Sequence, residues 1–297
     1  MEHRASSGAG DSMLIEPIPR WPELTPGGAV PALIETAWCR EVDATSFVTG
    51  LALRAMRARP DLPSGRLRER MLDFVTGCEA EAPPGAFAFW PPSARPAWAA
   101  RVPADVDDTA ICLTELFLAG RIGRAEAIRR ALRLFLPNRV RSGDEPRPPW
   151  IPDGAFRTWL VPAGSPGNPV DCAANANVLA LFATLGMREA PGRHAAVLLI
   201  QQGVAWAGAA PARLRALTPF YPEPAEFRLA VEHAVACGCA DLAPVAGRLA
   251  RMTGTGPPLP DAVLCTAAYA RDGWRSPALA AIRLACGRSA PAEARQP

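Results

Sequence analysis

The sequence of 297 residues contains no lysine, no block of like charge and no long apolar run. No stretch approaches the roughly 18 uninterrupted apolar residues of a membrane span, and the polar first residues lack the apolar core of a secretory signal. The 32 basic residues, all arginine, are spread among 29 acidic ones and leave a formal charge of +3. Because nucleic-acid binding usually requires a clustered basic face, we expect no nucleic-acid partner. We expect a cytoplasmic protein, and peripheral membrane contact stays open.

Several catalytic signatures are also missing. The chain has no Gly-rich phosphate loop, no Gly-x-Ser-x-Gly turn and no His-Glu-x-x-His pair, which leaves oxidoreductase, kinase and hydrolase functions without support. Eight cysteines in a chain of this length predict reduced thiols rather than a disulfide framework. His233, Cys237 and Cys239 superficially suit zinc, but positions i, i+4 and i+6 of one helix do not converge on one point. We therefore predict no metal site.

Helical periodicity is present over most of the chain. About eleven segments space their apolar residues for one helix face, and most of them end at Gly or Pro. The predicted helices span residues 30–39, 44–57, 66–77, 108–119, 125–136, 173–185, 194–204, 224–237, 242–252, 261–270 and 277–286. Since paired helices recur and alternating strand patterns are nearly absent, we predict an all-α fold of the α/α toroid type. Residues 26–288 would form this single domain between flexible segments at 1–25 and 289–297.

Two long linkers, residues 79–104 and 140–170, interrupt the helical pattern. Connections in compact domains are usually about 4–6 residues long, and much longer ones are commonly functional or disordered. Both linkers are rich in Pro, Gly and tryptophan, and their tryptophans argue against disorder. We therefore expect the two linkers to contribute to a functional site.

Three carboxylates, Asp105, Asp107 and Asp108, lie within four residues where the first linker meets an apolar helix. Like charges crowded into a site closed off from water raise at least one pKa, so that a carboxylic acid stays protonated near neutral pH. The helix dipole favours the anions instead, by about 0.3–1 kcal/mol when exposed and up to about 2 kcal/mol when partly buried. Two simpler interpretations stay open, which are a helix N-cap and a Mg²⁺ or Ca²⁺ site.

The string Asp105-Val-Asp-Asp-Thr-Ala110 resembles the DxDDTA motif of squalene–hopene cyclases and class II terpene cyclases. The upstream segment Gly85-Ala-Phe-Ala-Phe89 resembles the Gly-Gly-Phe-Ala-Phe segment that precedes this motif in hopene cyclases, and two linked matches are more specific than one. The resemblance implies an α/α toroid and an acid-initiated carbocation cyclisation. It implies that Asp107 protonates an alkene or epoxide, while Asp105 and Asp108 tune and orient it.

The resemblance also implies a cavity for a small hydrophobic isoprenoid, in which aromatic faces stabilise cations by about 0.5–2 kcal/mol. The aromatic candidates for this lining are Phe87, Phe89, Trp90, Trp98, Trp150 and Trp159. Asn175 and Asn177 fall in the first two turns of a second predicted helix that an Asp precedes. Asparagine is a poor helix former there unless its amide has a role. Tyr221 and Glu223 end the next linker and are candidates for the rim. Plain packing or helix capping explains each of these residues as well.

A single toroid provides only half of the enclosure that two-domain cyclases have. The long linkers, a second copy of the chain or another protein would close the pocket, or the substrate is smaller than squalene. No Asp-Asp-x-x-Asp run is present, so we expect no ionisation of a diphosphate and no cofactor, with Mg²⁺ needed only to hold a diphosphate. The alternative function is a non-catalytic toroid that binds an isoprenoid or another hydrophobic ligand, or that acts as a scaffold.

Overall fold

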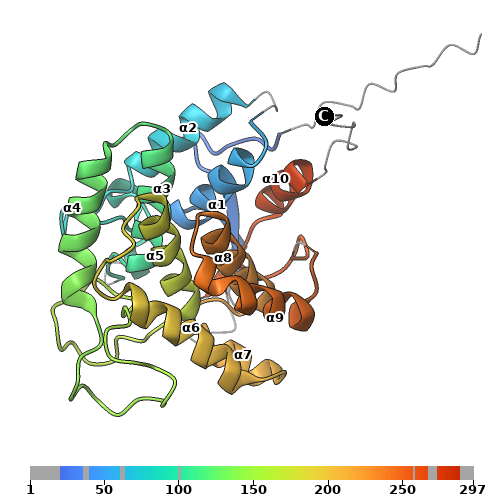
Figure 1. Ribbon diagram of the computed structural model, residues 1–297. Helices are drawn as coiled ribbons and strands as arrows, with labels where there is room; N and C mark the ends of the chain where they lie inside the picture. Colours follow the sequence, from blue (N-terminus) through green and yellow to red (C-terminus); the bar gives the residue numbers. More distant parts are fainter. Residues whose placement is uncertain are drawn as a thin grey trace, which may run out of the picture.

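A computed structural model describes residues 21–35, 40–60, 64–99, 102–256, 258–266 and 273–287. This described part is mostly helical and carries a small four-stranded antiparallel sheet (Figure 1). Residues 1–20 and 289–297 of the predicted flexible segments lie outside it, whereas Trp21 and Leu24 pack against the core. None of the described helices is both long and apolar enough to cross a membrane.

The helices of the described residues are α1 (Ser46–Arg57), α2 (Gly65–Thr76), α3 (Val106–Leu118), α4 (Arg124–Phe135), α5 (Cys172–Thr184), α6 (Arg193–Ala207), α7 (Pro211–Leu217), α8 (Pro224–Ala236), α9 (Ala243–Thr253) and α10 (Pro277–Gly287). The predicted helices from 44–57 to 242–252, and the last one at 277–286, are confirmed with ends shifted by a few residues. The sequence did not predict α7, because its seven residues are too few for a clear helical period.

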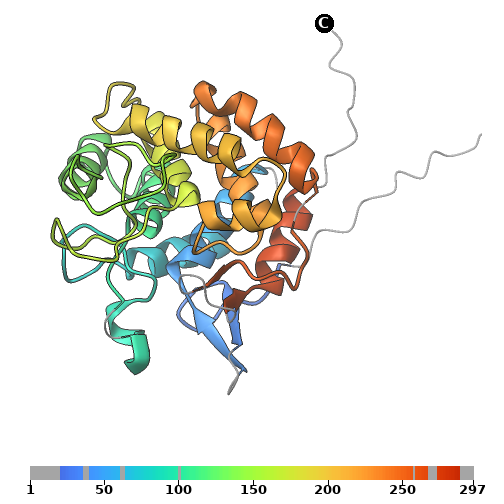
Figure 2. The ribbon, with the colours of Figure 1, turned by 90° about the horizontal axis from the view of Figure 1, so that it is seen from below.

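The all-α prediction is wrong in one part of the molecule, where the four strands form. The strands are β1 (Pro31–Glu35), β2 (Arg40–Ala44), β3 (Cys265–Thr266) and β4 (Gly273–Arg275), in the order β2-β1-β4-β3. The predicted helix at 30–39 is therefore a strand over 31–35, and that at 261–270 is not helical over its described residues. Pairing of β1 with β4, some 240 residues later in the chain, supplies hydrogen bonds that no local pattern reveals. Figure 2 shows these blue and dark red segments side by side.

The helices divide into buried and amphipathic ones. Helix α3 is buried at every position from Val106 to Leu116, and α5 from Cys172 to Phe182. Helix α4 buries only the stripe formed by Ala127, Ala131, Leu134 and Phe135, and α2 and α9 likewise bury one face. Helices α3 and α5 therefore lie inside the molecule, and the amphipathic helices α2, α4 and α9 lie around them.

The buried helices pack in the order α1, α3, α5 and α8, and α10 packs back against α1 (Figure 1). Thr45 is the N-cap of helix α1, and its hydroxyl accepts the Val48 N–H. The first residues of α3 and α5, Phe47 of α1 and the turn before α8 line one cavity. The N-terminal ends of four buried helices thus meet at the same place.

Candidate functional site

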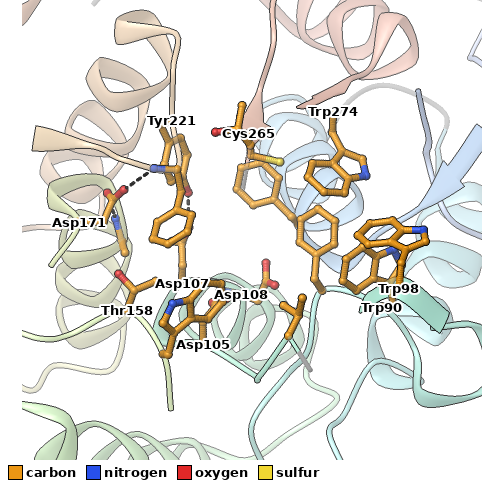
Figure 3. A pocket seen from close by; sticks show the side chains of 17 residues that line it. Trp90, Trp98, Asp105, Asp107, Asp108, Thr158, Asp171, Tyr221, Cys265 and Trp274 are labelled. Atoms are coloured by element: carbon orange, nitrogen blue, oxygen red, sulfur yellow. Dashed lines mark hydrogen bonds between the residues drawn. The ribbon is translucent and has the colours of Figure 1, made fainter. Parts of the chain in front are cut away.

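A cavity of about 190 Å³ lies where these helix ends meet. Its aromatic lining consists of Phe47, Phe89, Trp90, Trp98, Trp159, Phe220, Tyr221 and Trp274. Four carboxyl side chains also face it, from Asp105, Asp107, Asp108 and Asp171 (Figure 3). The site is therefore apolar apart from a concentrated group of acids.

The first linker is fixed directly onto the acid motif. The Phe87 N–H donates to Oγ1 of Thr109 at 3.0 Å, and Thr109 directly follows the last aspartate of the motif. At the start of α1, the Ser46 N–H donates to the Phe89 carbonyl at 2.9 Å. These bonds bring the Phe89 ring to the cavity, while the Phe87 side chain is buried in the core and does not line it. They give a physical reason for the two sequence motifs to occur together.

The second linker is held against the same motif by short strand-like pairing. The Val106 N–H donates to the Thr158 carbonyl, and the Leu160 N–H donates to the Ala104 carbonyl, both at 2.9 Å. The side-chain amide of Asn168 contacts both backbone groups of Trp159 at 2.8 Å. Trp159 and Thr158 therefore lie in the cavity wall, and the buried Thr158 hydroxyl has no partner among the described residues.

Asp105 and Asp108 form a close pair at the start of α3. Oδ1 of Asp105 accepts the Asp108 N–H at 2.7 Å, so Asp105 is the N-cap of the helix. Burial, together with the charge of Asp107, raises the pKa of Asp105 to about 8. Asp108 is 2% exposed, and its Oδ2 has no hydrogen-bond partner within the described part of the chain. Burial and the two neighbouring carboxylates raise the pKa of Asp108 well above its ordinary value, so burial and repulsion outweigh the helix dipole here.

Asp107 differs from its neighbours because both of its oxygens have donors. Nδ2 of Asn177 donates to Oδ1 at 2.7 Å, and the Tyr221 hydroxyl donates to Oδ2. Nη2 of Arg54 in turn donates to Oδ1 of Asn177 at 2.9 Å, which fixes the orientation of the amide. Burial raises the pKa of Asp107, and Tyr221, Asn177 and Arg54 oppose that rise. Asp107 is therefore the carboxyl of the motif whose anion the protein stabilises best.

Asp171 is a fourth buried carboxyl, and it is the N-cap of α5. Its Oδ1 accepts the N–H groups of Ala173 and Ala174, and its Oδ2 accepts the Phe220 N–H at 3.2 Å. Burial and the charge of Asp107 raise the pKa of Asp171 to about 7, while these three donors act against the rise. Asp171 thus joins α5 to the turn that carries Phe220 and Tyr221.

A cluster of tryptophans forms another part of the cavity wall, and β2 positions it. The Asp43 carboxylate accepts the indole N–H of Trp90 at 2.9 Å and that of Trp274 at 2.7 Å. Trp274 packs edge-on against Phe89 with ring centres 4.9 Å apart. Trp98 contacts both tryptophans and is 63% exposed, so it lies at the mouth of the cavity. The sequence missed Trp274 and Asp43 because strand pairing brings them here.

Several predicted site residues lie elsewhere. Trp150 stacks on Trp206 with ring centres 5.6 Å apart and does not line the cavity. Asn175 exchanges hydrogen bonds of 2.9 and 3.0 Å with the backbone of Phe156, which is a structural role. Glu223 caps α8 by accepting the Ala225 N–H at 3.2 Å. Asn177 is outside the cavity lining but reaches the acid motif through Asp107.

Within the described ranges, no group of three or more His, Cys, Asp or Glu side chains could hold a metal ion. Cys237 contacts the His233 ring at 3.5 Å, while Cys239 contacts Arg193 instead. No protein-family model matches the chain, and neither does any curated protein sequence. The chemistry of the site therefore has to be inferred from its own geometry.

Because the buried carboxyls have raised pKa values, we expect the free energy of unfolding to fall as pH rises. In the folded protein the pKa values of Asp105 and Asp171 are about 8 and about 7, whereas an ordinary Asp titrates at 3.8. The folded state therefore binds more protons between pH 4 and 8, and the free energy of unfolding decreases across that window. One extra proton over two pH units corresponds to about 2.7 kcal/mol, so the Tm should fall by at least about 5 °C from pH 5 to pH 8.

Thermal unfolding followed by circular dichroism at several pH values checks this expectation. Asp105→Asn should flatten the dependence, and the exposed Asp261→Asn should leave it unchanged. A wild-type Tm that is constant or rises between pH 5 and pH 8 would contradict it.

Proposed function

We propose that this protein is a class II terpene cyclase-like enzyme, in which Asp107 protonates an alkene or epoxide of an isoprenoid and starts carbocation cyclisation or isomerisation. The observation that carries the proposal is a group of buried carboxyls with raised pKa values inside an otherwise aromatic cavity. A protonated carboxylic acid next to an apolar ligand is the arrangement that alkene protonation requires.

We also propose that the helices form an α/α toroid to which the small sheet is added. The inner ring would consist of α1, α3, α5 and α8, with α2, α4, α6 and α9 outside it. The packing order of the buried helices and the return of α10 onto α1 support this arrangement. In such a ring the inner helices run parallel, which is consistent with their N-terminal ends meeting at one cavity.

In the proposed step, the O–H bond of Asp107 breaks and the π electrons of the substrate form the new C–H bond. The O–H electron pair stays on Asp107, where the Tyr221 hydroxyl and the Asn177 amide stabilise the carboxylate. Each carboxyl oxygen has two lone pairs, so a proton facing the cavity is compatible with these contacts. Loss of a proton from the final cation to the carboxyl group restores the starting state.

The walls would guide the cation between these two proton transfers. Aromatic faces of Phe89, Trp159 and Trp274 line the cavity, and a desolvated cation over such a face gains about 0.5–2 kcal/mol. The volume of about 190 Å³ is close to the roughly 150 Å³ cavity that binds benzene in an engineered protein. A short isoprenoid, or one end of a longer chain reaching out past Trp98, therefore fits better than folded squalene. Mg²⁺ would be needed only if that substrate carries a diphosphate.

Product analysis tests the proposal. The purified protein is incubated in D₂O with linear isoprenoids, from short diphosphates to squalene and its epoxide, and products are identified by gas chromatography and mass spectrometry. We expect a cyclic or isomerised product that carries solvent deuterium. If isoprenoids bind saturably but no member of the panel is converted, the alternative of a non-catalytic binding toroid would be the better description.

The aromatic wall provides a separate prediction. Trp159→Leu should lower kcat about 2- to 30-fold, which corresponds to losing about 0.5–2 kcal/mol of cation stabilisation. Trp206→Leu is the matched control, because Trp206 stacks on Trp150 outside the cavity. Steady-state kinetics of both variants checks this, and equal effects on kcat would argue against a role for Trp159 in the reaction.

A further inference from the structure

A second cavity of about 430 Å³ lies among α1, α5, α8 and α10. Tyr221 lines both cavities, and Asn177 lines only the second one. Both side chains are almost fully buried, so they form a wall between the two cavities.

The two carboxylates that line the second cavity are each held by an arginine. Arg228 is 2% exposed, and its Nη1 donates to both Glu232 oxygens at 2.9 Å. Its Nη2 donates to the Gly256 carbonyl, whereas its Nε is buried without an acceptor among the residues that the structure describes. Arg283 donates to both Glu226 oxygens at 2.5 and 2.9 Å. The acids in this cavity are thus already neutralised.

Arg54 of α1 adds a further cation to the same cavity. In the part of the chain that the structure describes, its hydrogen bond goes to the neutral Asn177 amide, and its Nε is buried without an acceptor. His233 beside it does not add charge, because burial and the charges of Arg54 and Arg57 lower its pKa far below neutrality. Glu115 and Asp107 lie near enough to favour the charge of Arg54, but Glu115 is already paired with Arg57. A buried guanidinium N–H without an acceptor is costly, and a bound anion would offset that cost.

We propose that the second cavity binds a phosphate-type anion, either a small phosphate ester or a free phosphate or diphosphate, through the guanidinium groups of Arg54 and Arg228, which line it. Planar guanidinium groups suit phosphate oxygens, to which they donate charge-assisted hydrogen bonds. Leu51, Ala55 and Leu229 supply an apolar wall beside them, which would accept the organic part of an ester. The anion site does not require the proposed cyclase reaction, although Arg54 also orients the Asn177 amide that donates to Asp107.

Isothermal titration calorimetry of the full chain with inorganic phosphate, pyrophosphate and dimethylallyl diphosphate tests the site. We expect one saturable site, weakened at least about tenfold by Arg228→Gln and by Arg54→Gln. Arg213→Gln is the control, because Arg213 lies over the Trp206 ring outside this cavity. Circular dichroism establishes that each variant is folded, and Arg54→Gln remains informative if Arg228→Gln unfolds.

Tighter binding of the ester than of pyrophosphate would identify a phosphorylated organic ligand, and equal binding would identify the free anion. Absence of saturable binding of all three probes up to about 10 mM would overturn the proposal. Binding that neither arginine variant weakens would overturn it as well. Because calorimetry requires no turnover, failure of the anion-site proposal is distinguishable from failure of the proposed cyclase function.

Discussion

Asp107→Asn is expected to lower turnover at least about 100-fold, because positioned general acids contribute about 10²–10⁴ to a rate. The amide cannot donate the carboxylic proton, yet it has nearly the same shape, and one oxygen can still accept from Tyr221 or Asn177. The fold should therefore persist. Steady-state product formation measures the loss, and circular dichroism verifies that the variant is folded.

The matched control for this substitution is Asp261→Asn, which makes the same change at an exposed aspartate outside the cavity lining. It should retain wild-type turnover. Full activity of Asp107→Asn on a substrate that the wild type converts would exclude Asp107 as the proton donor. The proton would then have to come from another carboxyl of the cavity, which is Asp105, Asp108 or Asp171.

Asp171→Ala is expected to have the largest effect on stability, about 2–5 kcal/mol. It removes the acceptor of two N–H groups at the start of α5 and of the Phe220 N–H in the adjacent turn. Loss of a helix cap costs about 0.5–2 kcal/mol, and a buried unsatisfied donor adds about 1–3 kcal/mol. Because the same turn carries Tyr221, turnover should fall as well.

Chemical denaturation measures this difference in the free energy of unfolding. Glu223→Ala is the matched control, since Glu223 also caps a buried helix but accepts only the Ala225 N–H and lines neither cavity. It should cost about 1 kcal/mol. Equal losses in the two variants would mean that Asp171 acts only as an ordinary cap, without a role in joining α5 to the Tyr221 turn.

Local sequence patterns were sufficient for most of the helices and for the acid motif. Helix periodicity and caps act within a few residues, and Asp105 does cap α3 as an N-cap aspartate should. The segment 85–89 and the acid motif are joined in the fold by the hydrogen bond from the Phe87 N–H to the Thr109 hydroxyl. Both features depend on neighbours that are close in the chain or on one recognisable pattern.

The remaining parts of the site depend on contacts between distant segments. Trp274 reaches the cavity only because β4 pairs with β1, and Arg54 reaches Asn177 across 123 positions of sequence. Nothing in a tryptophan or an asparagine distinguishes a cavity residue from a packing one. For this reason Trp150 and Asn175 resembled site residues in the sequence, although they make structural contacts in the fold.

The most direct test is the protonation state of the acid motif at neutral pH, measured by infrared or NMR titration of the protein with isotope-labelled aspartate. Asp105→Asn, Asp107→Asn and Asp108→Asn assign the signals. We predict that at least one of the three carboxyls still carries its proton at pH 7, because burial and mutual repulsion raise their pKa values. Ionisation of all three near pH 4, as for exposed aspartates, would contradict an acid-initiated reaction at this site.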